Sequence, residues 1–167
     1  MALIGVSTAS FVLAEEERSR VCYISAMRRC LLRIEDMIRY EEPPLFELLM
    51  RLDLRTTPQE RQLTSMLHAC AHELEQNPGA KIAHSFRKKT KRIAGYGILT
   101  EEDKNAFESV LEELGCVGKM EQLKLLLSAE ERLKRREEAE TDVCRRRAKL
   151  ISSLGVTAGA ALFLLLI

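Results

Sequence analysis

The pattern of hydrophobic and polar positions predicts helices along the whole 167-residue chain. Between residues 21 and 38, apolar side chains recur at alternating steps of three and four, which is typical of a helix with a coiled-coil-like seam. These positions are Val21, Ile24, Met27, Leu31, Ile34 and Ile38. No Gly or Pro occurs between Gly5 and Pro43, so we expect one unbroken helix to run from the N-terminal apolar segment to "EEPP".

Shorter helices are predicted next, each bounded by a cap or a breaker. Pro44 suits the first turn of a short helix. "TPQE" at 57–60 is a capping box, and Thr100 with Asp103 resembles a second cap. "NPG" at 77–79 and "GYG" at 95–97 are expected to interrupt the chain.

The final helix is predicted to begin near Lys119, with "SAEE" at 128–131 as a candidate fresh start. Its stretch 130–142, "EERLKRREEAETD", is polar nearly all round, which is typical of a solvated connector. No strand-like alternation with turn signals is present. The sequence therefore predicts an all-α protein, a bundle of roughly six helices with hydrophobic segments at both ends.

The C-terminal segment 150–167 contains no charged residue. As a helix it would be about 27 Å long, close to the thickness of a bilayer's hydrocarbon core. A buried core helix is the alternative, but apolar residues on all sides favour a transmembrane helix. Gly155 and Gly159 either allow a close helix–helix contact or are glycines of the kind common in membrane helices.

Four cations stand directly before this segment. They are Arg145, Arg146, Arg147 and Lys149. Positive residues favour the cytoplasmic side and also attract anionic headgroups, so we expect a cytoplasmic main domain at the cell membrane.

Residues 1–14 are apolar, but they are few for a complete span. No Lys or Arg precedes them, which weakens a secretory signal. A short or N-terminally truncated anchor is favoured over an interfacial segment or the start of a soluble helix. We therefore divide the chain into an N-terminal hydrophobic segment (1–14), a cytoplasmic helical domain (15–148) and a transmembrane helix (149–167).

Charge and aromatic content argue against nucleic acid as a partner. The net charge is +1, aromatic residues make up 5% and Trp is absent, so a basic surface with stacking platforms is not expected. One basic tract, "RKKTKR", is either a solvated helix end or a contact for anionic lipid or an acidic partner. Its cations are Arg87, Lys88, Lys89, Lys91 and Arg92.

Candidate chemistry is sparse. Five widely spaced cysteines are typical of reduced thiols. His68 and His72 stand one turn apart with Cys70 between them, a spacing that can ligate zinc, but two histidines are not a site and Ala69 replaces the Glu of the known zinc helix. No nucleophile with a base, and no phosphate-binding glycine loop, occurs at recognisable spacing. We expect neither enzymatic activity nor a cofactor.

Three segments carry a family resemblance, and together they cover nearly the whole chain. The C-terminal "LGVTAGAALFLLLI" fits the pattern LGxxxGxxLxxLL. "LLRIEDMIRYEEPPLFELL" contains Glu35, Ile38, Tyr40, Pro44 and Leu45 in a second pattern, and "EDKNAFESVLEELG", followed by Gln122, fits a third. The chain thereby resembles the stage III sporulation protein AB family of endospore-forming bacteria, although that family often has Trp where Phe86 stands.

The resemblance implies a function that spacing alone does not. The family belongs to the mother-cell-to-forespore channel complex, and its helical domain looks like the cytoplasmic domain of the type II secretion platform protein. It implies a non-enzymatic membrane-anchored scaffold in the mother-cell membrane around the forespore. Its partners would be the other channel subunits, with the complex's secretion-type ATPase as a candidate contact by fold-level analogy. The alternatives are a tail-anchored helical adaptor and a metal or redox protein using His68, Cys70 and His72.

Overall fold

The computed structural model describes the backbone of residues 2–77, 79–91 and 93–166, and the side chains of residues 15–77, 79–91, 93 and 95–146. Over this part of the chain the protein is all-α, as predicted, with seven helices and no strand. The helices are α1 (Ala2–Tyr40), α2 (Leu45–Met50), α3 (Pro58–Gln76), α4 (Ile82–Thr90), α5 (Ala94–Gly97), α6 (Glu101–Glu113) and α7 (Lys119–Leu166).

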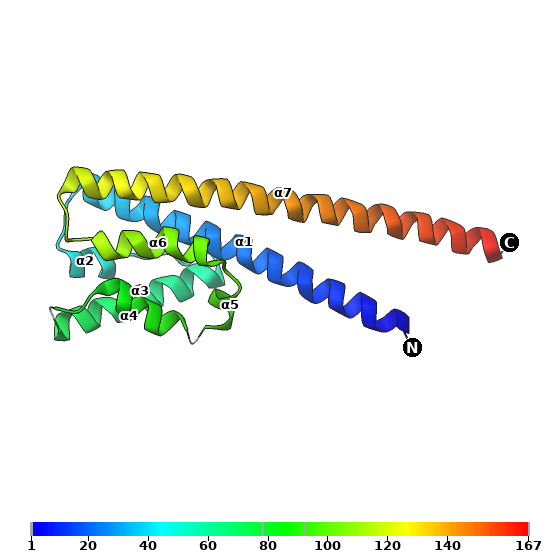
Figure 1. The fold of residues 1–167 in the computed structure, drawn as a ribbon, viewed down its shortest axis with the longest axis horizontal. Coiled ribbons are helices and arrows are strands. Elements are labelled where there is room, and N and C mark those ends of the chain that lie inside the picture. The colour runs from blue at the N-terminus through cyan, green and yellow to red at the C-terminus, as the bar shows by residue number, and fades with distance from the viewer. Residues whose placement is uncertain (1, 78, 92, 167) are drawn as a thin grey trace.

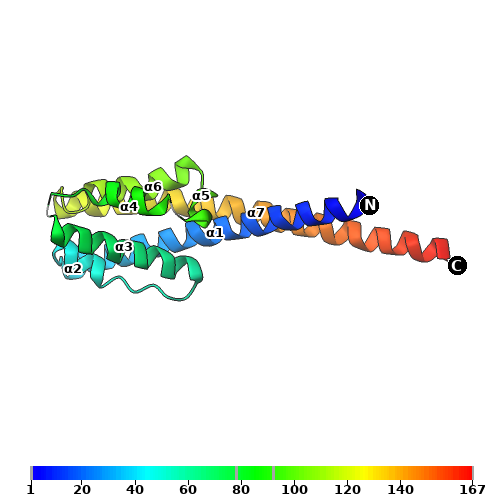
Figure 2. The same cartoon turned by 90° about the horizontal axis from the view of Figure 1, so that it is seen from below.

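Two long helices and five short ones give the molecule its shape (Figure 1). α1 and α7 run antiparallel along one side, and α2–α6 pack beside only one end of this pair. Both long helices then continue past the short ones in the same direction, so the N and C termini lie at the same end (Figures 1 and 2). We call the part in which the short helices accompany α1 and α7 the bundle.

α1 is the unbroken helix that the sequence predicts. Its seam faces the core, where Ile24, Met27, Leu31 and Ile34 are fully buried. It ends just before "EEPP", where the N–H groups of Glu41 and Glu42 both donate to the carbonyl of Met37. Pro44 differs slightly from the prediction, because it occupies the N-cap of α2 and Leu45 takes the first helical position.

Both predicted caps are confirmed. The Thr57 hydroxyl accepts from the Glu60 N–H at 3.2 Å, while the Glu60 carboxylate accepts from the Thr57 N–H at 3.0 Å, and Pro58 stands at the first position of α3. Thr100 and Asp103 form the same reciprocal pair at the start of α6. Each pair satisfies backbone donors that a helix start leaves unpaired.

The "GYG" segment separates α4 from α6, as predicted, and itself forms the four-residue helix α5. Gly95 allows α5 to lie close to α1, because a Cβ there would lie 2.7 Å from the Tyr23 ring. The close approach brings Tyr23 against Tyr96, with ring centroids 6.4 Å apart. Phe86 continues the aromatic cluster from α4, 5.8 Å from Tyr96 and 5.5 Å from Phe107.

α7 corrects two predictions. It runs through "SAEE" without a new start, and the polar stretch 130–142 is only partly solvated. Its Leu133 continues a buried row with Leu126 and Ala129, and Glu137 and Glu140 pair with α1, while other charged side chains of the stretch are exposed. The polar face of α7 is matched by cations of α1, which the pattern of α7 alone could not reveal.

Gly115, just after α6, is expected to resist substitution. Its φ is +80°, and a Cβ there would lie 2.9 Å from Cδ2 of Leu45. Gly115→Ala should lower the free energy of unfolding by about 1–2 kcal/mol, because L residues disfavour this left-handed conformation. Urea unfolding of the full chain in detergent measures it. Gly97→Ala is the matched control, since a Cβ at Gly97 meets no atom within 4 Å, and equal losses in both variants would contradict the explanation.

Candidate functional site

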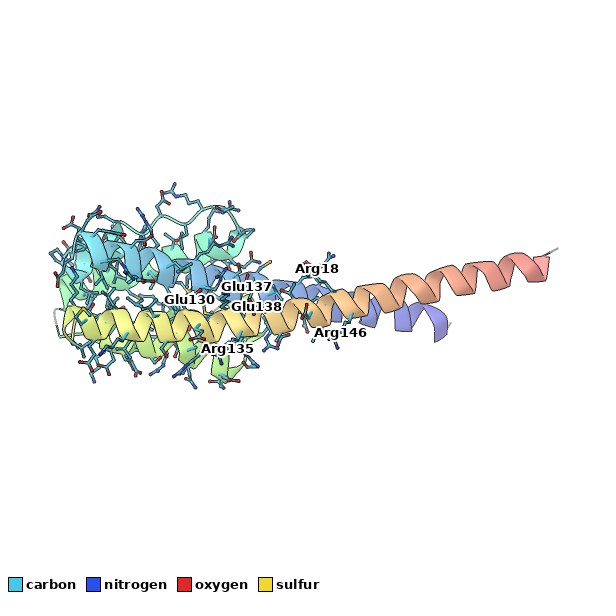
Figure 3. All side chains as sticks on the ribbon, turned by 90° about the horizontal axis from the view of Figure 1, so that it is seen from above. Arg18, Glu130, Arg135, Glu137, Glu138 and Arg146 are labelled. Carbon is cyan, nitrogen blue, oxygen red and sulfur yellow. The ribbon has the colours of Figure 1, made fainter. Side chains whose placement is uncertain are left out.

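Ion pairs join α1 to α7 along the bundle. Arg28 of α1 lies between two carboxylates of α7, with Nη1 3.1 Å from Glu130 and Nε 2.8 Å from Glu137. Figure 3 shows Glu130 and Glu137 on α7 where it passes α1. Where α7 begins, Lys119 contacts Glu42 at 3.4 Å. Single exposed pairs contribute little to stability, but pairs spread along two helices hold them in one register.

A second set of ion pairs centres on Asp103 of α6, whose side chain is fully buried. Arg20 of α1 donates to Oδ2 of Asp103 from Nη2 at 3.0 Å and from Nε at 3.2 Å. Arg136 of α7 donates from Nε to Oδ1 at 2.9 Å. Arg20 also pairs with Glu140 of α7 at 3.1 Å. We call Arg20, Thr100, Asp103, Arg136 and Glu140 the Asp103 cluster.

The Asp103 cluster favours an ionised carboxylate. Burial opposes the charged form, but hydrogen bonds from Thr100, Arg136 and Arg20 outweigh it and lower the pKa of Asp103 below its ordinary value. Thr100 contributes through both its N–H, at 3.0 Å, and its hydroxyl, at 2.6 Å. Asp103, the third residue of α6, therefore connects this helix to both α1 and α7.

Two further buried carboxylates connect neighbouring helices. Glu108 of α6 accepts hydrogen bonds from Arg87 of α4 and from the Tyr96 hydroxyl at 3.1 Å. Burial, together with the nearby Glu108 charge, raises the pKa of Tyr96. Glu60 of α3 pairs with Arg29 of α1 at 2.6 Å. These contacts make the short helices and the long pair one packed unit.

The structure divides the predicted basic tract. Arg87 also pairs with Glu112 at 2.7 Å, and Lys89 pairs with Glu73 of α3 at 3.0 Å. These two cations hold α4 against its neighbours. Lys88 and Lys91 are exposed, and Arg92 lies outside the described residues.

The candidate zinc ligands do not converge. The Nε2 atom of His68 lies 2.8 Å from the carbonyl oxygen of Leu52, while His72 is exposed and lies 3.6 Å from Glu75. Burial raises the pKa of the Cys70 thiol to about 11, which disfavours the thiolate that binds metals. Within the part of the chain that the structure describes, no group of three His, Cys, Asp or Glu side chains is arranged to hold a metal ion.

Charged residues of both signs lie where the two long helices leave the bundle, with Glu15, Glu16 and Asp142 exposed there beside the arginines. Arg18 of α1 and Arg146 of α7 lie in this region in Figure 3, and both are exposed, as is Arg145. Among residues with described side chains, no helical stretch is both long and apolar enough to cross a bilayer. The predicted segments 1–14 and 149–167, with Arg147, Lys149, Gly155 and Gly159, lie outside those residues.

Sequence reasoning recognised Asp103 only as a helix cap and overlooked its partners. Arg20 and Arg136 lie 83 and 33 residues away from it in the chain, so no local spacing links them. Only a weak indication of these ion pairs was present in the sequence. Arg20 and Arg28 are charged residues next to the apolar seam of α1, where a partner of opposite charge is expected.

Comparison with known proteins supports one family. No curated protein and no solved structure matches the chain. The model of the family described as stage III sporulation protein AB matches residues 1–167, which is the full sequence given. The chain therefore belongs to the stage III sporulation protein AB family, with the role in sporulation that this membership implies.

Proposed function

We propose that the protein is a non-enzymatic, membrane-anchored platform subunit of the mother-cell-to-forespore channel complex. Its segment 150–167 would be a transmembrane helix, and residues 1–14 a second, shorter anchor. The bundle would stand in the mother-cell cytoplasm and present its surface to other channel subunits. The complex's secretion-type ATPase is the candidate cytoplasmic partner.

The observation that carries this proposal is the shared direction of the two long helices. Both leave the bundle at the same end (Figure 1), and their sequences become apolar along that course. Cations at 145–147 and at Lys149 precede the C-terminal apolar segment, the order expected for a helix entering a membrane from the cytoplasm. The Asp103 cluster braces both helices against α6, so the bundle would move with its anchors.

Membrane location tests the proposal directly. The full chain should sediment with membranes from sporulating cells and leave them only in detergent. Ala158→Arg with Leu162→Arg places two charges near the middle of the predicted span, each opposing insertion by about 2.5–3.5 kcal/mol. We expect this variant to move to the soluble fraction and spore counts to fall at least about tenfold.

A size-matched exchange provides the control. Ala158→Leu with Leu162→Ala keeps the segment apolar and should keep both the membrane location and the spore count. A wild-type chain found in the supernatant without detergent would refute the anchored platform. So would normal sporulation by the soluble arginine variant.

A further inference from the structure

The outward face of α4 carries cations at helical spacing. Lys81, His84, Lys88 and Lys91 recur at steps of three and four, from the N-cap to the C-cap of the helix, and all are exposed. The opposite face is buried through Ile82, Ala83 and Phe86. Residues at these steps share one side of a helix, so the four side chains form a single row, which we call the basic ridge.

The charge of the basic ridge is not neutralised inside the bundle. The neighbouring cations Arg87 and Lys89 are held by carboxylates of α6 and α3. In contrast, no described carboxylate forms an ion pair with Lys81, Lys88 or Lys91. The pKa of the Glu73 carboxyl is lowered chiefly by the hydrogen bond from Lys89 and, to a lesser extent, by the nearby charge of Lys88. The ridge thus presents three lysine charges in a chain whose net charge is +1.

The exposed surface of α7 combines both signs. For example, Glu131 pairs with Arg135 at 2.5 Å, and Glu121 and Lys124 are exposed within one turn. A mixed surface is usual for a solvated helix and keeps a protein soluble. A row of one sign instead attracts an oppositely charged partner and disfavours like-charged ones.

The position of the basic ridge disfavours a membrane as its ligand. α4 packs on α3 and α6, and it lies on the side of the bundle away from α7 (Figures 1 and 2). α4 lies within the length of the bundle and does not extend along the two long helices to the end where the termini lie. In a chain anchored through those termini, the ridge would face sideways into the cytoplasm.

We infer that the basic ridge is a docking surface for an acidic protein segment. From Lys81 to Lys91 the row spans about 15 Å, so the partner would present carboxylates over the same length. A partner helix with Glu or Asp at every third or fourth position fits this requirement. The inference rests on the proposed platform function, to which it adds a surface and the chemistry of its partner.

A designed peptide tests the docking surface. The probe is a labelled helical peptide of about 14 residues with Glu every three or four residues, and its Gln counterpart serves as the neutral reference. Fluorescence anisotropy measures its binding to the full chain in phosphatidylcholine nanodiscs at about 0.15 M salt. We expect the Glu peptide to bind at least about tenfold tighter than the Gln peptide.

Matched charge reversals identify the surface. Lys81→Glu, Lys88→Glu and Lys91→Glu together should weaken binding of the Glu peptide at least about tenfold and lower spore counts similarly. Lys124→Glu, Arg132→Glu and Lys134→Glu change the net charge equally from exposed positions on α7. This control should change both readouts by less than about threefold.

Several results would overturn the inference. Equal losses in the two reversed chains would show an effect of net charge alone, and normal sporulation by the ridge variant would show that docking there is not needed.

Phosphatidylglycerol vesicles that bind the wild type but not the ridge variant would make the ridge a lipid site. Self-association lost only in the ridge variant would assign it to a second copy. Neither reversal touches 150–167, so both chains should stay in the membrane, and failure here leaves the platform proposal standing.

Discussion

Asp103→Ala is expected to lower the free energy of unfolding by about 3 kcal/mol. The change removes a fully buried carboxylate that accepts hydrogen bonds from Arg20, Arg136 and Thr100. Breaking a buried ion pair costs about 3–5 kcal/mol when the remaining charge stays buried. Both arginines keep some access to water, which places the expected loss at the lower end. Urea unfolding of the full chain in detergent, followed by circular dichroism, measures it.

Two further variants separate the effect of the Asp103 charge from the effect of removing any carboxylate. Asp103→Asn keeps an acceptor for the Thr100 N–H but removes the charge, so it should lose less stability than Asp103→Ala. Asp36→Ala removes an exposed carboxylate of α1 and should change the free energy of unfolding by less than about 0.5 kcal/mol. If Asp103→Ala were no more destabilising than Asp36→Ala, the cluster would not brace the bundle.

The lowered pKa of Asp103 also predicts a pH dependence. Between the folded pKa and the ordinary value of 3.8, the unfolded chain binds more protons, so stability rises with pH in this interval. The contribution of the charge is therefore complete above about pH 5 and is lost as the pH falls through the folded pKa. The stability difference between wild type and Asp103→Asn should stay constant near neutral pH and shrink below about pH 4. A difference that grows on acidification would contradict an ionised Asp103.

Phe86→Ala is expected to destabilise the bundle by about 3–5 kcal/mol. Phe86 is fully buried, and its ring contacts Tyr96 and Phe107, so alanine would leave a cavity between α4, α5 and α6. The thermal midpoint should fall by roughly 10 °C or more. Differential scanning calorimetry of the full chain in detergent would report this shift.

Phe46→Ala is the matched control for Phe86→Ala. Phe46 of α2 is 37% exposed and makes an edge contact with His72. Since water already reaches much of this ring, its loss should cost less than about 1.5 kcal/mol. Similar losses at the two positions would mean that the aromatic cluster is not the centre of the core.

Local features of the fold followed directly from the sequence. The seam of α1 and the caps at Thr57 and Thr100 each depend on residues a few positions apart, and the structure confirms them. The packing of α5 on α1 was not predicted, because Tyr23, which lies in the space left by the missing side chain of Gly95, is 72 positions away in the chain. The polar part of α7 was misread for a similar reason, since its partners Arg20 and Arg28 belong to α1.

The candidate surfaces show the same division. The basic tract was visible as "RKKTKR". Only the packing of α4 decided that Arg87 and Lys89 pair with carboxylates of α6 and α3, while Lys88 and Lys91 form no such pair. Lys81 and His84 joined them because the helix brings positions three and four apart onto one face, and its buried side fixes which face is free.

By itself, the sequence determined the all-α class, the capped starts of α3 and α6 and the family pattern, because hydrophobic period and capping act within a turn or two of helix. Only the tertiary structure decided which charges meet. It brought Arg20, Asp103 and Arg136 together from three helices, directed both long helices to one end, and left the basic ridge unpaired. Charge pairing depends on distance in space, and side chains far apart in the chain acquire that distance only when the helices pack.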